Sequence, residues 1–322
     1  MKTVGRIFKW LVIILIVGII ALIAYVQTSW EKEFTADYPA IKASTDSAII
    51  ARGESLAYGL AHCAVCHVPD EKLDNVLRGE KVPLSGGWEI SIPPGTFRAP
   101  NITPDEETGI GKLTDEELAR TLRHMVSHDN KVVLPFMPYA NMSDADLQAI
   151  ISFLRSQPAQ YHKVPENEYS FLGKAVMAFG LIKPTGPTKT PPKTVPIEAS
   201  VDYGKYLANS VGDCVGCHTE RSMQTGEFLG EPFAGGGDVN EPGSTMQFTT
   251  PNLTPDQNTG IMANWTEEEF IARFRQGRVY EESPMPWELF SRVDEVELKA
   301  LYRYLMSLDP VYNKIEVVKE KA

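Results

Sequence analysis

Two short stretches of this sequence decide its fold: Cys63-Ala-Val-Cys66-His67 and Cys214-Val-Gly-Cys217-His218. They share one pattern, in which two cysteines are separated by two residues and followed at once by a histidine. Together they use all 4 cysteines of the 322-residue chain. On a helical backbone this spacing puts the two thiols about one turn apart, with the imidazole directly after them.

This pattern is the attachment signal for c-type haem. The two thiols add to the two vinyl groups of one haem, and the imidazole becomes an axial ligand of the iron. We therefore predict two haem c groups, with Cys63, Cys66, Cys214 and Cys217 as covalent attachment residues and His67 and His218 as iron ligands. The alternatives are two redox dithiols or one four-cysteine zinc site. Neither alternative explains why a histidine follows each pair.

The chain repeats itself around these motifs. The sequence PNITPD at 100–105 matches PNLTPD at 251–256, and TGI at 108–110 matches TGI at 259–261. Cys63 and Cys214 are 151 positions apart, and so are Asn101 and Asn252. Similarity at a fixed interval indicates two copies of one structural unit.

Each unit continues with two predicted helices. Thr114 with Glu117, and Thr266 with Glu269, form capping boxes that begin a helix. The last helix of each unit is amphipathic, with apolar residues at helical spacing: Leu147, Ile150, Ile151 and Leu154, then Leu298, Leu301, Tyr302 and Leu305. Each unit thus reads as helix, haem motif, long loop, helix, Met-Pro loop and helix. That is the layout of a class I cytochrome c domain.

A haem iron in an electron carrier needs a sixth ligand, and methionine is the usual partner of histidine in cytochromes c. Met137 and Met285 occupy matching places in the two units, each before a proline, so we predict that they bind the irons. Met142 and, more weakly, Met246 are the reserve candidates. His128 in place of Met137 would give a bis-histidine haem of lower potential.

Other residues are predicted to surround the haems: Pro100, Asn101, Pro251, Asn252, Arg123 and Arg275. A carbonyl of each Pro-Asn turn would accept the Nδ1–H of the axial histidine, and a turn with no such role is the alternative. The arginines would pair with haem propionates, or would be ordinary exposed helix residues. His124 and His128, four apart on one expected helix face, have a spacing that can bind metal, although we favour solvated histidines.

The first thirty residues indicate a membrane anchor. Lys2, Arg6 and Lys9 precede the uncharged run from Trp10 to Trp30. A helix of about 20 apolar residues crosses a bilayer, and the basic flank places the N-terminus in the cytoplasm. A cleaved signal peptide is the alternative, but no good small-x-small site follows the apolar run. We expect a single-pass protein of the inner membrane with residues 31–322 in the periplasm.

The predicted fold class is all-α, an N-terminal transmembrane helix followed by two tandem class I cytochrome c domains. The expected parts are an anchor (1–30), a polar stalk (31–47), domain 1 (48–157), a connector (158–198), domain 2 (199–310) and a charged tail (311–322). In the connector, 183–193 should be extended because it is rich in proline. Residues 171–179 are apolar enough to dock on a domain.

The charge balance excludes one class of partner. The chain has 42 acidic and 31 basic residues and a formal net charge of −11. Nucleic-acid binding depends on neutralising phosphates with Lys and Arg, so a nucleic-acid partner is not expected. An acidic surface is compatible with attraction to a basic protein partner.

The succession of C-x-x-C-H, PN(I/L)TPD-x-x-TGI, a Thr-capped helix and a late Met-Pro resembles the cytochrome c subunits of membrane-bound alcohol and gluconate dehydrogenases. The resemblance covers about residues 48–156 and 199–309. It implies one ligand set of Cys63, Cys66, His67 and Met137, and another of Cys214, Cys217, His218 and Met285. It also implies electron transfer from a periplasmic dehydrogenase toward quinone or an oxidase. The chain departs from that family in having two haem motifs rather than three, and its membrane helix is N-terminal.

We therefore expect an electron-transfer protein with no catalysis of its own. Its donor would be a dehydrogenase or a quinol-oxidising complex, and its acceptor a terminal oxidase or a soluble cytochrome. It would act as a free carrier or as a subunit of a respiratory complex. The alternative is a dihaem enzyme, a peroxidase or thiosulfate-type dehydrogenase, in which one iron keeps an open position. A haem sensor is a weaker alternative, because no signalling module accompanies the motifs.

Overall fold

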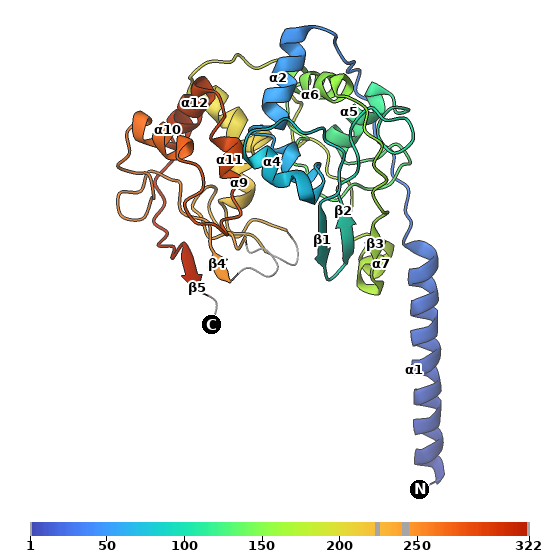
Figure 1. The fold of residues 1–322 in the computed structure, drawn as a ribbon. Coiled ribbons are helices and arrows are strands. Elements are labelled where there is room, and N and C mark those ends of the chain that lie inside the picture. Colours follow the sequence, from blue (N-terminus) through green and yellow to red (C-terminus); the bar gives the residue numbers. More distant parts are fainter. Residues whose placement is uncertain (1, 223–225, 240–244, 321–322) are drawn as a thin grey trace.

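The computed structural model describes residues 2–222, 226–239 and 245–320. A long helix, α1 (Lys2–Ser29), projects from a globular body that contains the other elements (Figure 1). Apolar side chains such as Phe8 and Ile20 are exposed along it, at 69% and 61%. By length and composition this helix is a candidate membrane span, with a mean hydropathy of 2.9, and the described residues contain 1 such helix.

The first half of the body is built on two crossing helices, α2 (Ser47–Ala57) and α6 (Asp144–Ser156). Gly53 lets their backbones touch, because a Cβ there would lie 1.8 Å from the carbonyl oxygen of Ala149. The elements between these helices are α3 (Cys63–Cys66), a 3-10 turn (Asp70–Lys72), α4 (Leu73–Leu77), β1 (Glu89–Ile92), β2 (Gly95–Arg98) and α5 (Asp115–His124).

The second half repeats this crossing with α8 (Val201–Tyr206) and α12 (Glu295–Leu305). Gly204, which is 151 positions after Gly53, would place a Cβ 1.9 Å from the carbonyl oxygen of Ala300. Its other elements are a π-helical turn (Leu207–Val211), α9 (Cys214–Cys217), β4 (Met246–Phe248), α10 (Glu267–Arg275), α11 (Trp287–Phe290) and β5 (Val318–Glu320).

The expected helices of each unit are confirmed. Thr114 with Glu117 and Thr266 with Glu269 both form complete capping boxes, at the starts of α5 and α10. One expectation about α5 is wrong. The helix ends at His124 because Met125 adopts a left-handed backbone, with φ 54°. His128 therefore lies beyond the helix, and the two histidines do not share a helix face.

The all-α expectation needs correction, because the long loops form two small sheets. Strands β1, β2 and β3 (Glu168–Tyr169) make an antiparallel sheet in which Ile90 lies opposite Phe97. Strand β5, within the expected charged tail, pairs with β4. Long loops run over the surface, and their backbone groups need hydrogen-bond partners, which these short ladders supply. The tail up to residue 320 is thus part of the fold.

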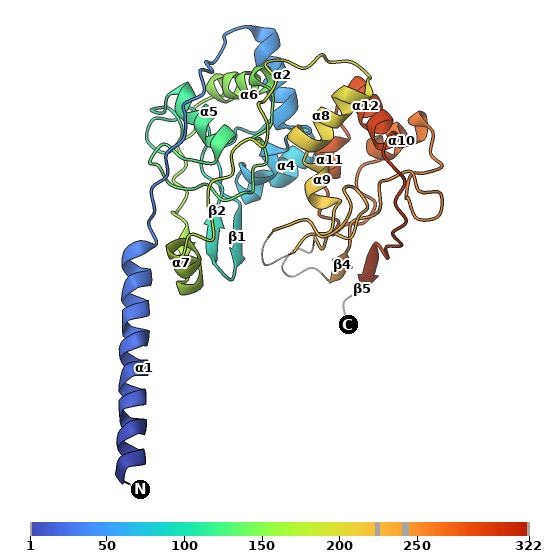
Figure 2. The same cartoon turned by 180° about the vertical axis from the view of Figure 1, so that it is seen from behind.

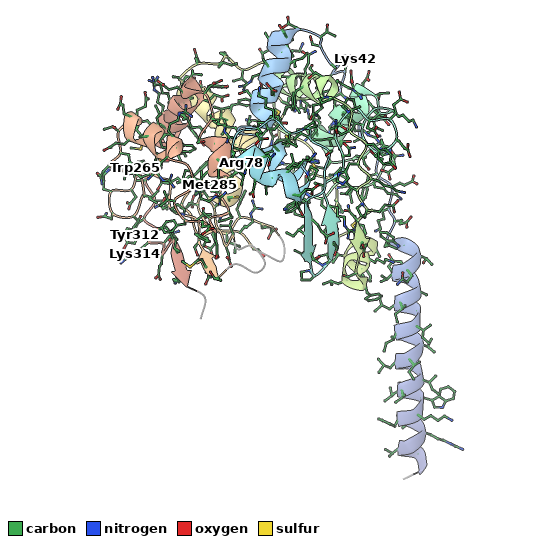
Figure 3. All side chains as sticks on the ribbon, in the orientation of Figure 1. Lys42, Arg78, Trp265, Met285, Tyr312 and Lys314 are labelled. Atoms are coloured by element: carbon green, nitrogen blue, oxygen red, sulfur yellow. The ribbon has the colours of Figure 1, made fainter. Side chains whose placement is uncertain are left out.

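The expected stalk and connector also pack on the body. The N–H of Phe34 donates to the carbonyl of Asn130 at 2.8 Å, and the N–H of Ala43 donates to Asp115 at 2.8 Å. Lys42, labelled in Figure 3, pairs with Glu116. In the connector, residues 183–193 contain no helix or strand, as expected. Helix α7 (Phe171–Ala178) lies beside the end of α1 in both views (Figure 1 and Figure 2).

The two halves pack against each other through buried polar groups. Arg52 on α2 donates from Nη1 to Glu297 on α12 at 2.6 Å and from Nη2 to the hydroxyl of Tyr203 on α8 at 3.1 Å. The hydroxyl of Tyr206 on α8 donates to Asp146 on α6 at 2.7 Å. These bonds join α2 and α6 of the first half to α8 and α12 of the second, all four of which are labelled in Figure 2.

Candidate haem sites

Each C-x-x-C-H motif forms one turn of helix. The N–H of His67 donates to the carbonyl of Cys63 at 2.9 Å, and the N–H of His218 donates to that of Cys214 at 2.8 Å. The two cysteines of each motif therefore lie one turn apart, and the histidine follows where the turn ends. The residues before the turns, His62 and Asp213, both have left-handed backbones, with φ 39° and 47°. This shared conformation starts both turns in the same way.

Both histidines are held by a proline carbonyl. Nδ1 of His67 lies 2.9 Å from the carbonyl oxygen of Pro100, and Nδ1 of His218 lies 3.1 Å from that of Pro251. Burial lowers the pKa of both imidazoles, which favours the neutral ring. A neutral ring that donates from Nδ1 keeps the lone pair of Nε2 for a metal ion. The Pro-Asn turns thus reach the histidines, as expected from the sequence.

The asparagines build these turns. Asn101 donates from Nδ2 to Thr108 at 3.0 Å and to the carbonyl of Gln160 at 2.8 Å, and its Oδ1 accepts the N–H of Thr103 at 2.9 Å. The equivalent bonds of Asn252 go to Thr259, Val311 and Thr254, at 3.0, 2.8 and 2.9 Å. Both asparagines are buried. Their contribution is to fix the loop that presents the proline carbonyl.

The structure places Met137 and Met285 in equivalent loops. Each lies before a proline, between the capped helix and the last helix of its half, and packs partly buried against the core. Met285 lies next to the start of α11 (Figure 3). The reserve candidates have other positions, since Met142 is fully buried in the core and Met246 begins β4.

Two arginines hold the segment that follows each methionine. Arg123 donates from Nη1 to the carbonyls of Ala140 and Met142. Arg275 donates to the carbonyls of Ser291 and Val293, the latter at 2.7 Å. Arg123 is 3% exposed, so the alternative of an ordinary exposed arginine is wrong for this residue. The propionate pairing of both residues stays a prediction, while these contacts position the methionine loops.

The cysteine environments do not suit the alternative uses of these motifs. Burial raises the pKa of Cys63 to about 11 and that of Cys214 to about 12. Reactive dithiols instead have a lowered pKa at an electropositive, accessible position. Within the described residues, no three His, Cys, Asp or Glu side chains gather as a metal-binding group. Two thiols one turn apart and a neutral imidazole fit covalent attachment and ligation of a haem.

The residue directly before the first attachment turn contacts the second half of the body. The imidazole of His62 meets the ring of Phe290 edge-on, with centroids 6.0 Å apart. Tyr139, which is 151 positions before Phe290, has its pKa raised by burial, by the thiols of Cys63 and Cys66, and by the carboxylate of Asp213. Position 213 is in turn 151 after position 62. Nothing in the sequence pattern pointed to the contact between His62 and Phe290.

Comparison with known proteins identifies the family. A family model for cytochrome c matches residues 50–158. The cytochrome c subunit of an alcohol dehydrogenase (quinone) from Gluconobacter oxydans is 32% identical over 244 residues, which are 73% of this chain and 48% of that protein. The gluconate 2-dehydrogenase cytochrome c subunit of Pantoea cypripedii is 28% identical over 246 residues, 72% of this chain and 52% of the relative. The chain thus spans about half the length of these dehydrogenase subunits.

A further relative is similar to this chain in length as well as sequence. A diheme cytochrome c-type protein of Cereibacter sphaeroides is 30% identical over 234 residues, which cover 68% of this chain and 73% of the relative. This match over 73% of the relative and the two C-x-x-C-H turns both indicate a cytochrome c. The chain therefore belongs to the cytochrome c family.

Proposed function

We propose that this chain is a membrane-anchored dihaem cytochrome c with one haem in each of two cytochrome c domains, residues 48–157 and 199–310. The observation that carries the proposal is the duplicated attachment geometry. In both halves a cysteine pair occupies one helical turn, and the next histidine donates from Nδ1 to a proline carbonyl 33 positions further on. Two copies of this cysteine and histidine arrangement support two haems.

The residues of the chain would hold each haem and set its reduction potential. A bound haem supplies one-electron chemistry at its iron. His67 and His218 would provide Nε2 as an iron ligand, and Met137 and Met285 would provide sulfur, a ligand pair that raises the reduction potential. The loop contacts of Arg123 and Arg275 hold the two methionine loops in place. A fully occupied coordination sphere favours electron transfer over substrate binding.

The chain would act as a short relay. His62, directly before the first attachment turn, contacts Phe290 of the second half, which supports electron transfer between the halves within one molecule. Relatives of this chain include cytochrome subunits of alcohol, gluconate and fructose dehydrogenases, which supports a periplasmic dehydrogenase as donor. A quinol-oxidising complex is the other candidate donor. A terminal oxidase or a soluble cytochrome would accept the electrons, and α1 would hold the relay at the inner membrane.

Carbon monoxide binding to the dithionite-reduced protein tests the ligand assignment. We expect two covalent haems per chain and an unchanged visible spectrum, because both irons are already six-coordinate. Met137→Ala and Met285→Ala should each open one haem to carbon monoxide, whereas Met142→Leu should open neither. Ready binding by the unmodified protein would instead favour an enzyme with an open iron. A single haem per chain would overturn the dihaem proposal.

A separate experiment addresses the donor. Gentle detergent extraction followed by affinity purification of the full chain should bring down a dehydrogenase in a fixed ratio, with its substrate reducing both haems. Reduction by quinol but by no dehydrogenase substrate would move the donor to a quinol-oxidising complex.

A further inference from the structure

Helix α7 of the connector is attached to the end of the proposed membrane helix. The hydroxyl of Tyr25 on α1 donates to the carbonyl of Ala178 at 3.3 Å, and its ring lies 5.5 Å from that of Phe179. One turn earlier on α7, Lys174 lies over the ring of Trp30, which directly follows α1, at 5.0 Å from its centroid. These contacts place α7 where α1 ends and the body begins, as both views show (Figure 1 and Figure 2).

One side of α7 is fixed to the body. A Cβ at Gly173 would lie 2.0 Å from the carbonyl oxygen of Pro94, in the turn between β1 and β2. Helix α7 is therefore in close contact with the hairpin that these two strands form. Met177 is buried on the same helix, and the hydroxyl of Ser170 caps the helix start while donating to the carbonyl of Pro93 at 2.7 Å. The helix is therefore held rigidly at this position.

The other side of α7 and the residues directly after it expose a group of large apolar side chains, which we call the α7 apolar face: Phe171, Leu172, Phe179 and Leu181, with exposed fractions of 48, 52, 54 and 74%. Exposure of this much apolar surface is unfavourable in water. It is continuous with the exposed apolar side chains of α1 through the contact between Tyr25 and Phe179.

The charges around this face favour one kind of occupant. Lys174 lies on α7 and Lys183 follows Leu181 by two residues, although the overall net charge of the chain is −11. A Cβ at Gly180 would lie 3.3 Å from Nζ of Lys32, so a third lysine reaches the end of this segment. A short apolar helix flanked by lysines is typical of segments that lie in the interface of an anionic bilayer. A basic protein partner would instead be repelled by these lysines.

We propose that α7 is an interfacial membrane helix, whose apolar face enters the lipid headgroup region and whose neighbouring lysines contact anionic lipid phosphates. The proposal rests on the proposed function in one respect, that α1 spans the bilayer. Together, α1 and α7 form two points of attachment. They fix the orientation of the first half relative to the membrane, which a single helix with a free linker would not do.

Nitroxide accessibility on the full-length protein with both haems tests this. Leu172→Cys reports on the α7 apolar face, Ile16→Cys reports on α1, and Ile197→Cys is a matched control on the same connector, with an exposed aliphatic side chain. Each variant is spin-labelled in nanodiscs that contain phosphatidylcholine with phosphatidylglycerol. Collision rates with oxygen and with a water-soluble nickel chelate are then compared.

We expect the oxygen-to-nickel ratio at position 172 to exceed that at 197 by several-fold and to approach the ratio at 16. Lys183→Glu should lower the ratio at 172 in anionic discs and leave it unchanged in discs of phosphatidylcholine alone. Equal oxygen-to-nickel ratios at positions 172 and 197, with position 16 protected from the nickel chelate, would overturn the proposal and leave the membrane anchor intact. Water-like values at 16 would instead contradict the proposed anchor itself. Shielding of 172 only when a co-purified protein is present would assign the face to that protein.

Discussion

Arg52 of the first half and Glu297 of the second form an ion pair across the interface, with Nη1 and Oε1 2.6 Å apart. The same guanidinium donates from Nε to Asp146 at 2.9 Å. Asp146 and Glu297 are buried, and they are equivalent positions of the repeat, 151 apart. Burial opposes the charge of Arg52, but the two carboxylates raise its pKa, so it stays protonated.

Removing this guanidinium should destabilise the protein strongly. Arg52→Ala leaves two buried carboxylates without their cation, and breaking a buried pair in this way costs about 3–5 kcal/mol. Guanidinium chloride unfolding, followed by circular dichroism, measures the free energy of unfolding. The control is Arg78→Ala, an exposed residue whose pair with Glu80 is 3.6 Å long and whose loss should change little. A small effect at Arg52, equal to that at Arg78, would show that the interface does not depend on this charge.

The helix crossings should not tolerate a methyl group. Gly53→Ala and Gly204→Ala each drive a Cβ into a carbonyl of the opposing helix, 1.8 and 1.9 Å away. Overpacking of this kind costs roughly 1–3 kcal/mol, measured as a lower midpoint of thermal unfolding. Gly18→Ala on α1, where nothing lies within 4 Å of the new Cβ, should leave the midpoint unchanged. Equal midpoints for all three variants would mean that the helices can separate at no cost.

Asp213 should make stability depend on pH. Burial raises its pKa from 3.8 to about 6, with Arg221 opposing the shift. The folded state thus binds this proton more tightly than the unfolded state, so the free energy of unfolding falls as pH rises from about 4 to about 6. The fall is at most about 3 kcal/mol. Asp213→Asn, which also tolerates the left-handed backbone, should remove this fall, whereas Asp309→Asn at an exposed position should keep it. An unchanged pH profile in Asp213→Asn would contradict the assignment.

The arginines that hold the methionine loops should control ligand exchange. Arg123→Ala frees the carbonyls of Ala140 and Met142, and the loosened loop should allow carbon monoxide to reach the first haem only. Arg275→Ala should do the same for the second haem, so that each variant is the control of the other. If instead neither variant binds carbon monoxide and the reduction potential becomes more dependent on pH, the arginines act on the propionates.

Much of the fold was predictable because the chain contains the same unit twice. The fixed interval identified equivalent residues without knowledge of their contacts, and the capping boxes located α5 and α10. The contact of Pro100 with His67 followed from the needs of an axial histidine. These features depend on local chemistry or on its repetition.

The interface between the halves was not predictable in this way. Arg52 and Glu297 are 245 positions apart. The residues next to Arg52 in the sequence do not indicate that the second half of the chain covers it. The same holds for His62 and Phe290. The end of α5 was missed because Met125 takes a left-handed backbone that asparagine or glycine more often adopts. The sequence allowed only short strand pieces in the long loops, and their pairing into two sheets could not be predicted because strands of two to four residues carry too little alternation.

Positions 52 and 203 are equivalent in the repeat, yet one is arginine and the other tyrosine. In a homodimer made from two identical copies of one half, these positions would be the same residue, and two guanidiniums or two phenols would meet near the symmetry axis. Joining both copies in one polypeptide removes that constraint. A single cation then serves two carboxylates, and the two proposed haem sites could be tuned separately, because a mutation in one half is not imposed on the other.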